Sequence, residues 1–305
     1  MKYSEWLRIG ANSTVLDWIN GGVPFQFKND ILPPPFKFSN PTFSKKELAF
    51  LKGEIPRLLN NGYIEKCDAP HCVSPLKCVP KKNGKTRLCI NLYELNRYSD
   101  PPKFQYEGID AVSQCISHND CLLTVDLKDG FYHVPIRKEH RQFFGFQFNR
   151  QFYQWCVCPF GWNGSPYYFY KIMREVVKFI RDNDIRVVLY VDDLLLMSAA
   201  SQVTDHRDFV LDTFADLGLS INYDKSTLIP ATTCTYLGYT IDSCGQDFKP
   251  WLYIPRDKIC VLKKDITRYM NRGLIPARAL AKICGIGVSL SRAIIPGKLK
   301  LRHLY

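Results

Sequence analysis

The stretch VVLYVDDLLLMS, residues 187–198, decides the fold. Two apolar runs, residues 187–189 and 194–196, flank the adjacent carboxylates Asp192 and Asp193. Apolar runs of this length predict two buried strands of a hairpin with the acids at its tip. An ionised aspartate is costly to bury unless it is paired or binds a cation, and two adjacent ones repel each other. The pattern indicates a divalent-metal platform, but on this stretch alone an Asp-Asp turn joining two ordinary strands explains it equally well.

A third carboxylate follows another apolar strand, far from this hairpin in the sequence. CLLTVDLKDGF, residues 121–131, predicts a buried strand that ends in Asp126 and is followed by a glycine turn. Ser165 caps a predicted helix that runs to about residue 182, and a second helix is expected over residues 202–217. This order of elements predicts an α+β fold, with an antiparallel sheet backed by two helices.

The flanking segments predict further elements. Residues 1–43, rich in proline and aromatic residues, predict an extended strap with a short amphipathic piece near residues 15–19. Ser44 and Glu47 predict a capping box at the start of a helix. CTYLGYTID, residues 234–242, predicts a single strand, and the pattern becomes helical after residue 254.

Composition excludes several classes of protein. No apolar run approaches the ~18 residues of a membrane span, and the N-terminus lacks a signal-peptide pattern. The twelve cysteines contain no CxxC pair, so we expect reduced thiols in an intracellular protein, with the choice between cytoplasm and nucleus left open. No histidine stands at metal-ligand spacing from these cysteines, so no zinc site is predicted.

The positive charge lies mainly in the C-terminal part. Residues 246–305 hold 13 Lys and Arg against 3 acids, whereas the first 245 residues hold 28 against 26. This asymmetry predicts that the C-terminal part faces a polyanion, with a merely soluble basic helical surface as the alternative.

The three acids suit a particular chemistry. Carboxylates from two strands can hold two divalent cations about 3.5–4 Å apart, which activate an attacking oxygen and neutralise a polyphosphate. Mg²⁺ fits best because it prefers oxygen ligands. The same ligands suit a nuclease, so the acids alone leave the direction of the chemistry open.

Five motifs in order give the chain a resemblance to a retroelement reverse transcriptase, from about residue 44 to residue 305. The fingers hairpin of that family resembles KKNGKTRLCINLYELN (81–96), and its catalytic motifs resemble VDLKDGF (125–131), PFGWNGSP (159–166), YVDD (190–193) and LGLSINYDKS (217–226). YLGY (236–239) resembles the primer grip, and the tail from Trp251 resembles the helical thumb. The amino-acid sequences QFFGFQF (142–148) and PFGWNGSPYYF (159–169) are most similar to those of tyrosine-recombinase (DIRS-type) retrotransposons and are also similar to those of Ty3-like elements.

The resemblance implies roles for the catalytic residues. Asp126, Asp192 and Asp193 would bind two Mg²⁺ ions, or Mn²⁺ in their place, with the Leu127 carbonyl as an additional ligand. Lys225 would protonate the pyrophosphate leaving group, with a solvated surface lysine as the alternative.

The resemblance also implies a site for the incoming deoxynucleoside triphosphate. Phe131 would be a gate whose ring collides with a ribose 2′-hydroxyl. The nucleotide-binding set would comprise Lys81 or Lys82, Arg87, the backbone N–H groups of Asp129 and Gly130, Phe131, Phe160 and Gly161. Core aromatics are the alternative for the two phenylalanines.

Primer and duplex would be held further along the chain. Leu237, Gly238 and Tyr239 would form the primer grip. The thumb residues Lys263, Lys264, Arg268, Lys282 and Gly285 would track the duplex backbone, in keeping with the local positive charge.

The fold implied is a right-hand polymerase. Residues 1–43 would be the N-terminal strap, 44–120 part of the fingers, 121–245 the palm with a fingers insertion at about 137–160, and 246–305 the thumb. The function implied is that of the RNA-directed DNA polymerase core of a retrotransposon, adding deoxynucleotides to a primer 3′-hydroxyl by two-metal phosphoryl transfer. Its partners would be an RNA template, a DNA primer and deoxynucleoside triphosphates, without a membrane. A catalytically inactive or domesticated nucleic-acid-binding copy is the alternative.

The chain departs from the family pattern at two places. Asn91, Tyr93, Leu95 and Asn96 stand where D-x-R-x-L-N is usual, so an Asp–Arg pair is lost and local rigidity is in question. A ribonuclease H domain would normally follow Tyr305, so we expect this piece not to degrade RNA and to come from a larger polyprotein or a truncated copy.

Overall fold

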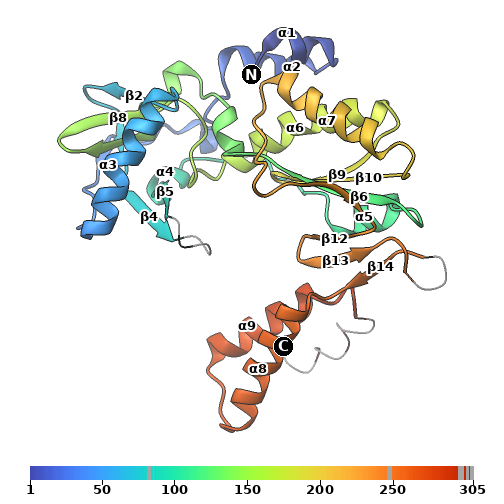
Figure 1. The fold of residues 1–305 in the computed structure, drawn as a ribbon. Coiled ribbons are helices and arrows are strands. Elements are labelled where there is room, and N and C mark those ends of the chain that lie inside the picture. Colours follow the sequence, from blue (N-terminus) through green and yellow to red (C-terminus); the bar gives the residue numbers. More distant parts are fainter. Residues whose placement is uncertain (81–83, 85, 246–248, 295–298, 300–301, 303–305) are drawn as a thin grey trace. The chain divides into compact units, whose positions relative to one another are not determined.

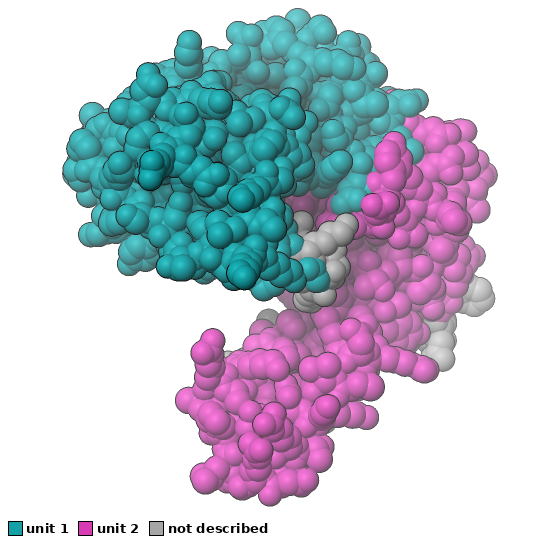
Figure 2. Space-filling model, turned by 60° about the vertical axis from the view of Figure 1, so that its left-hand side comes forward, with its two compact units in different colours: residues 1–106, 127–183, 210–222 teal, residues 107–126, 184–209, 223–305 magenta. Residues whose placement is uncertain are grey.

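The computed structural model describes residues 1–80, 84, 86–245, 249–294, 299 and 302 (Figure 1). The chain divides into two compact units (Figure 2). Residues 1–106, 127–183 and 210–222 form the first unit, and residues 107–126, 184–209 and 223–305 form the second. No helix in the described part of the chain is both long enough and apolar enough to cross a lipid bilayer.

The first unit is built on a five-stranded sheet in the order β1-β3-β7-β8-β2. Its strands are β1 (Phe36–Lys37), β2 (Ile64–Cys67), β3 (Cys72–Val73), β7 (Gly145–Phe148) and β8 (Gln151–Trp155). A separate hairpin pairs β4 (Leu76–Pro80) with β5 (Thr86–Ile90), as predicted. The helical elements are α1 (Tyr3–Arg8), α2 (Ser13–Gly21), α3 (Lys45–Asn60), α4 (Tyr93–Asn96) and α6 (Ser165–Asp182), with three 3₁₀ turns at Lys28–Asp30, Gly130–His133 and Lys138–Phe144.

Capping explains where the helices of this unit begin. Ser44 and Glu47 form the predicted capping box of α3: the Glu47 N–H donates to Ser44 Oγ, and the Ser44 N–H donates to Glu47 Oε2 at 2.8 Å. Helix α6 begins at Ser165, with Gly164 rather than Ser165 at the capping position. The predicted amphipathic piece is α2, capped by the Asn12 side chain, but the prediction that residues 1–43 are otherwise extended is wrong at α1.

The second unit contains a four-stranded antiparallel sheet in the order β11-β6-β10-β9. Its strands are β6 (Cys121–Asp126), β9 (Arg186–Tyr190), β10 (Asp193–Ser198) and β11 (Thr227–Ala231). The predicted hairpin with acids at its tip is therefore confirmed, since β9 ends at Tyr190 and pairs with β10 from Asp193. Helix α5 (Ile109–Cys115) and the basic helices α8 (Arg256–Met270) and α9 (Ala277–Ser289) also belong to this unit, and α7 (Val203–Leu217) contributes to both units.

A second sheet in this unit corrects one prediction. Residues 234–242 do not form a single strand: β12 (Thr233–Tyr236) turns back at Leu237 and Gly238 into β13 (Tyr239–Asp242), which pairs with β14 (Trp251–Tyr253). Both turn residues have positive φ, 48° at Leu237 and 77° at Gly238. We call β12 and β13 the grip hairpin.

One hydrophobic cluster joins the two sheets of this unit. Leu122 of β6, Val188 of β9 and Leu195 and Met197 of β10 are buried against residues of the grip hairpin and α5. Members from the grip hairpin and α5 are Tyr236, Tyr239, Ile241, Ile109 and Val112. The sheet face that carries Leu195 and Met197 is therefore covered by the grip hairpin.

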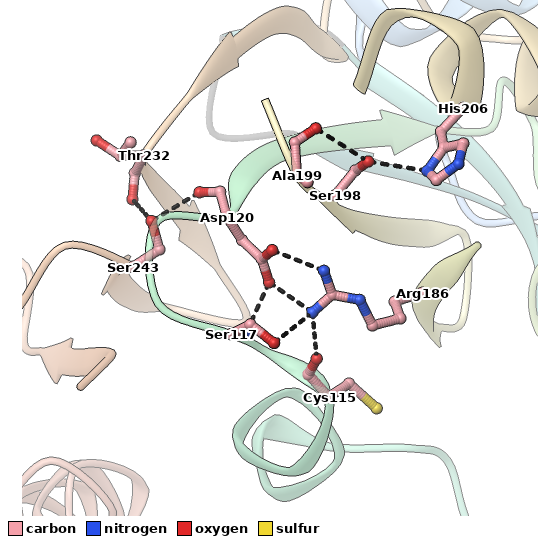
Figure 3. Close-up of polar contacts among 9 residues, drawn as sticks. All are labelled: Cys115, Ser117, Asp120, Arg186, Ser198, Ala199, His206, Thr232 and Ser243. Atoms are coloured by element: carbon pink, nitrogen blue, oxygen red, sulfur yellow. Dashed lines mark hydrogen bonds and ion pairs between the residues drawn. The ribbon is translucent and has the colours of Figure 1, made fainter. Parts of the chain in front are cut away.

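A buried ion pair fastens the far end of the same sheet (Figure 3). Asp120, just before β6, has a side chain only 3% exposed and pairs with Arg186 at the start of β9 at 2.6 Å. Arg186 also donates to the carbonyl of Cys115 at the end of α5, and the Ser243 hydroxyl donates to the Asp120 carbonyl. This group, which we call the Asp120 clasp, ties β6, β9, α5 and the end of β13 together (Figure 3).

Candidate active site

Two of the predicted carboxylates lie directly opposite each other across neighbouring strands. Asp126, the last residue of β6, is the register partner of Asp193, the first residue of β10. Register partners in an antiparallel pair point to the same face, so both carboxylates share the face of Leu122, Leu195 and Met197. The sequence places them there because side chains alternate along a strand with a period of two.

The turn that carries the acids is conformationally unusual. Val191 follows β9 with φ of 56°, in the left-handed region that a β-branched residue rarely adopts. A two-residue hairpin loop requires positive φ at its first position, and this loop consists of Val191 and Asp192. Such strain is typical of functional sites, where the surrounding structure must maintain it.

The carboxylates affect one another's protonation. Burial raises the pKa of Asp193 from its ordinary 3.8 to about 6, and the charges of Asp192 and Asp126 act in the same direction. The Asp126 side chain also hydrogen-bonds to Asp193, which favours a proton on the pair. Without a cation, the folded protein thus holds an excess of negative charge at this point.

Lys225 provides one cation. Its Nζ lies 3.2 Å from Asp126 Oδ2 and 3.3 Å from Oδ1, and its charge opposes the rise in the Asp193 pKa. The Lys225 side chain is 60% exposed, whereas that of Asp126 is 11% exposed. The structure therefore brings Lys225 to the carboxylates and pairs it with Asp126, while its role as a proton donor stays a prediction.

The donor set partly matches the predicted metal cluster. As the side chains are placed in the described part of the chain, no three carboxylate, imidazole or thiol groups converge closely enough to hold a metal ion. The structure instead presents the pair Asp126 and Asp193, with Asp192 close enough to act on Asp193 electrostatically. Closely spaced oxygen donors that repel one another fit a hard divalent cation in chemical type. The predicted ligand Leu127 is buried and belongs to the first unit.

Two neighbours of these carboxylates were not predicted. Ser226 Oγ accepts a hydrogen bond from the Asp126 N–H at 3.0 Å and so holds the end of β6. Tyr236 Oη bonds to the carbonyl of Asp193 at 3.0 Å. In a single sequence, nothing indicates that a serine beside a lysine, or a tyrosine in an apolar strand, will contact the carboxylates.

The first unit gathers several of the predicted nucleotide-binding residues. The Arg87 guanidinium lies 4.4 Å from the centre of the Phe160 ring, which in turn packs against Phe131 at 5.1 Å. Phe131 also contacts Phe169, a buried residue of α6, at 5.6 Å. Phe131 and Phe160 stay half-buried, so each ring retains an accessible surface. Lys81 and Lys82 lie outside the described residues.

The turn before Phe131 contains the two residues whose backbone N–H groups were predicted to bind phosphate, the half-buried Asp129 and the buried Gly130. Asp129 has φ of 53° and ψ of 41°, a left-handed conformation, and Gly130 begins the 3₁₀ turn. Arg57 of α3 holds the Asp129 side chain, with its Nη1 3.6 Å from Oδ2. His133 closes the turn: its Nδ1 bonds to the Gly130 carbonyl at 3.1 Å, and its Nε2 accepts from the Ser220 N–H at 3.0 Å. Burial lowers the pKa of His133, which keeps the imidazole neutral and both bonds intact.

The Phe160-Gly161 turn depends on the glycine and on Asn96. Gly161 has φ of 124°, and a Cβ there would lie 2.2 Å from the carbonyl oxygen of Ile90. The Asn96 side chain donates to the Gly161 carbonyl at 2.9 Å and accepts from the Asn163 N–H at 3.1 Å. Asn96 therefore supplies order at a place where the absence of the usual Asp–Arg pair had left local rigidity in question.

The predicted grip residues lie at the turn of the grip hairpin. The Gly238 carbonyl accepts a hydrogen bond from Lys258 Nζ of α8 at 2.9 Å. The Tyr239 hydroxyl donates to the Ser289 carbonyl of α9. Leu237 is half-buried and packs against the hydrophobic cluster. The turn is thus attached to the two basic helices.

The basic residues of these helices differ in their partners. Lys263, Lys264 and Arg268 of α8 are exposed. Lys282 of α9 pairs with Asp265 at 2.8 Å, so it joins the two helices and is less available to a ligand. Gly285 faces open space, with nothing near enough to contact an added Cβ.

Comparisons with known proteins show the family to which the chain belongs. The family model described as "Reverse transcriptase (RNA-dependent DNA polymerase)" matches residues 79–241, which is more than half of the chain. The chain is 25% identical to a putative enzymatic polyprotein of Cassava vein mosaic virus over 73% of its length, and 25% identical to the Pol polyprotein of transposon gypsy of Drosophila melanogaster over 66%. It is 26% identical over 64% of its length to the transposon Tf2-3 polyprotein of Schizosaccharomyces pombe. It spans 34%, 20% and 14% of these relatives.

Solved structures share the fold. A foamy viral protease–reverse transcriptase in complex with double-stranded DNA superposes with a TM-score of 0.73 at 20% identity, covering 93% of this chain and 47% of that one. The same type of protein in complex with an RNA/DNA hybrid gives 0.70 at 18% identity, covering 98% and 40%. The predicted α+β, right-hand polymerase fold is confirmed. The DIRS-type subgroup stays a prediction, while the similarity to transposons such as gypsy and Tf2-3 is consistent with a Ty3-like relationship.

Proposed function

The chain belongs to the reverse transcriptase (RNA-dependent DNA polymerase) family, and from that premise we propose that it is the RNA-directed DNA polymerase core of a retroelement. The proposed reaction is the attack of a primer 3′-hydroxyl on the α-phosphate of a deoxynucleoside triphosphate. The template would be RNA, and the product a DNA strand with release of pyrophosphate.

The observation that supports this proposal most strongly is the cross-strand pair Asp126 and Asp193. The two carboxylates share one sheet face, and the charge of Asp126 acts with burial to raise the pKa of Asp193. Carboxylates arranged in this way are stabilised most when a cation binds between them in place of the proton, because the cation removes their mutual repulsion.

Asp126, Asp193 and Asp192 would hold the divalent ions on which this family depends, with the Leu127 carbonyl as an additional oxygen ligand. Two Mg²⁺ ions are the proposed form, with Mn²⁺ as a substitute. When bound, such ions lower the pKa of an attacking hydroxyl and neutralise developing phosphate charge.

The protein's own residues would do the rest. Lys225 would give its proton to the leaving pyrophosphate, and its ion pair with Asp126, which puts an ammonium beside the carboxylates, supports this role. The N–H groups of Asp129 and Gly130, together with Arg87, would bind the triphosphate, and Phe131 would exclude a 2′-hydroxyl. Lys81 or Lys82 would add positive charge.

The assignment of regions follows from the family. We propose residues 44–120 and about 137–160 as fingers, the rest of 121–245 as palm, and 246–305 as thumb, after an N-terminal strap. The RNA template, the DNA primer and the nucleotides are the proposed partners, and an intracellular location is proposed with them. A ribonuclease H activity would come from another part of a longer polyprotein.

Primer extension on an RNA template with Mg²⁺ tests the function. The wild-type chain should extend a DNA primer. Asp126→Asn, Asp192→Asn and Asp193→Asn should each lose about a thousandfold or more in rate, because a bound metal ion stabilises the transition state by several kcal/mol. Asp208→Asn, which changes an exposed carboxylate of α7 paired with Arg207, is the matched control and should extend normally.

Binding of an RNA/DNA duplex measured alongside separates the alternatives. The asparagine variants should bind the duplex as the wild type does. A wild-type chain that binds the duplex but adds no nucleotide would be an inactive binder and would contradict the proposal. Normal extension by Asp193→Asn would contradict it as well.

A further inference from the structure

A buried tyrosine of the grip hairpin contacts the hairpin that carries the carboxylates. Tyr236 ends β12 and is 4% exposed. Its hydroxyl lies 3.0 Å from the carbonyl oxygen of Asp193 and 3.1 Å from that of Val188. Val188 belongs to β9 and Asp193 begins β10, so one hydroxyl bridges both strands of the hairpin.

The hydroxyl has a role that hydrophobic packing does not explain. The Tyr236 ring lies in the cluster that includes Val188, Leu195 and Met197, where a phenylalanine ring would fill the same space. The single hydroxyl hydrogen can bond to either carbonyl oxygen or be shared between the two, and a phenylalanine would leave both without this donor.

The same hairpin is attached at its turn to the basic helices. Lys258 of α8 donates to the Gly238 carbonyl, and the Tyr239 hydroxyl donates to Ser289 of α9. These two contacts start within three residues of Tyr236. The grip hairpin therefore makes hydrogen bonds to α8 and α9 at its turn and, through Tyr236, to the main chain of Asp193.

We propose that Tyr236 is a positioning residue that fixes the main chain of Asp193 relative to the grip turn. This inference rests on the proposed function. A primer end held at Leu237 and Gly238 would then meet the carboxylates at a fixed distance. Tyr236 touches neither substrate nor metal and acts only through the Asp193 carbonyl.

Tyr236→Phe tests this, since it removes one oxygen and leaves the ring. In single-turnover extension of a DNA primer on an RNA template, we expect the maximal rate to fall about three- to tenfold, the value of one hydrogen bond. The nucleotide KM and the duplex Kd should stay within about twofold, because the nucleotide and the duplex bind elsewhere. The Mg²⁺ concentration for half-maximal rate should rise, because Asp193 is less well placed.

Tyr168→Phe is the matched control. Tyr168 is fully buried, and its hydroxyl donates to the Pro24 carbonyl at 2.7 Å in the first unit, which contains none of the three aspartates. Both variants should lower the Tm by a similar amount, because each removes one buried hydroxyl bonded to a main-chain carbonyl. Only Tyr236→Phe should lower the maximal rate and shift the Mg²⁺ dependence.

Three results would overturn the inference. If Tyr236→Phe extends the primer at the wild-type rate, the hydroxyl does not position Asp193, and the proposed function stands. If Tyr168→Phe loses rate to the same extent, the effect is one of general stability. If the wild-type chain extends no primer, the proposed function fails and the inference fails with it.

Discussion

At the scale of single residues, the site is defined by charge that the fold concentrates. Asp193 sits opposite Asp126 and next to Asp192, and only Lys225 supplies a counter-charge among the groups that act on its pKa. Repulsion within such a cluster destabilises the folded protein when no cation is bound. The free energy of unfolding of the metal-free protein should therefore depend on pH.

We expect the metal-free protein to lose stability as the pH rises from about 4 to about 6 because of Asp193. Its pKa is raised from 3.8 to about 6 on folding, so the folded state binds the proton more tightly than the unfolded state over this range. Above pH 6 the loss is complete. Asp193→Asn should remove it and make the metal-free protein more stable at pH 7 by on the order of 1 kcal/mol, a value reduced for solvent screening.

Thermal unfolding in EDTA at pH 4, 5, 6 and 7 measures this effect. The wild type and Asp193→Asn should be equally stable at pH 4, and their free energies of unfolding should diverge above it. Taking the difference between the two proteins removes the contributions of all other titrating groups. A wild type that is as stable as Asp193→Asn at pH 7 in EDTA would show that the carboxylates do not repel each other.

Some residues of the site were predictable from sequence and others were not. Asp126 and Asp193 stand at the ends of apolar strands, and that pattern alone brings two acids to one edge of a sheet. Tyr236 and Asn96 stand within motifs that the sequence analysis noted, but the sequence does not show which groups their side chains bond to. Their roles depend on hydrogen bonds across 43 and 65 residues of sequence, which no local pattern contains.

At the scale of elements, the sheet of β11, β6, β10 and β9 is held at both ends. The grip hairpin bonds to the end with the carboxylates, and the Asp120 clasp fastens the other end. Asp120 is nearly fully buried and accepts two charged hydrogen bonds from Arg186, at 2.6 and 2.7 Å. Removing one partner of such a pair leaves an uncompensated buried charge.

Arg186→Met should therefore lower the free energy of unfolding by about 3 kcal/mol, the typical cost of breaking a buried ion pair from one side. Urea unfolding followed by circular dichroism measures the loss. Arg207→Met, which breaks the pair with the exposed Asp208, is the control and should cost clearly less, because no buried carboxylate loses its partner. Equal losses in the two variants would show that the clasp does not stabilise the sheet.

Elements with strong periodicity or clear caps were predicted correctly, and short ones were not. The catalytic hairpin, β6, α3 and α7 follow from apolar patterns and from the Ser44 capping box. Helix α1 has no side-chain cap and spans six residues, too few for a periodic signal. The turn of the grip hairpin was not predicted, because Leu237 has positive φ there and a leucine in the sequence does not indicate such a conformation.

At the scale of the whole molecule, the C-terminal part of the chain differs from the rest in its excess of positive charge. The excess of basic residues lies in the sequence of α8, α9 and the segments around them, where Lys263, Lys264 and Arg268 are exposed. Exposed cations that do not pair internally are those that can replace counterions on a nucleic acid.

Replacing Lys263, Lys264 and Arg268 together by glutamine should weaken duplex binding and reduce its salt dependence. The slope of log K against log salt should fall by about 0.7–0.9 for each phosphate that the protein no longer neutralises. Fluorescence anisotropy between 50 and 200 mM salt, about the range over which such slopes are clear, measures it. Lys282→Gln is the comparison, and it should change the slope less because Asp265 already neutralises that ammonium. An unchanged slope in the triple variant would exclude α8 from the binding surface.

The register between β6 and β10 constrains how this sequence can diverge. Asp120 is anchored at one end of β6 and Asp126 faces Asp193 at the other. An insertion or deletion of one residue between these points would turn Asp126 to the opposite face of the sheet, however well the apolar residues repacked. Functional relatives should therefore tolerate many substitutions among the five residues between Asp120 and Asp126 but no change in their number, and a copy with an altered strand length is expected to be inactive.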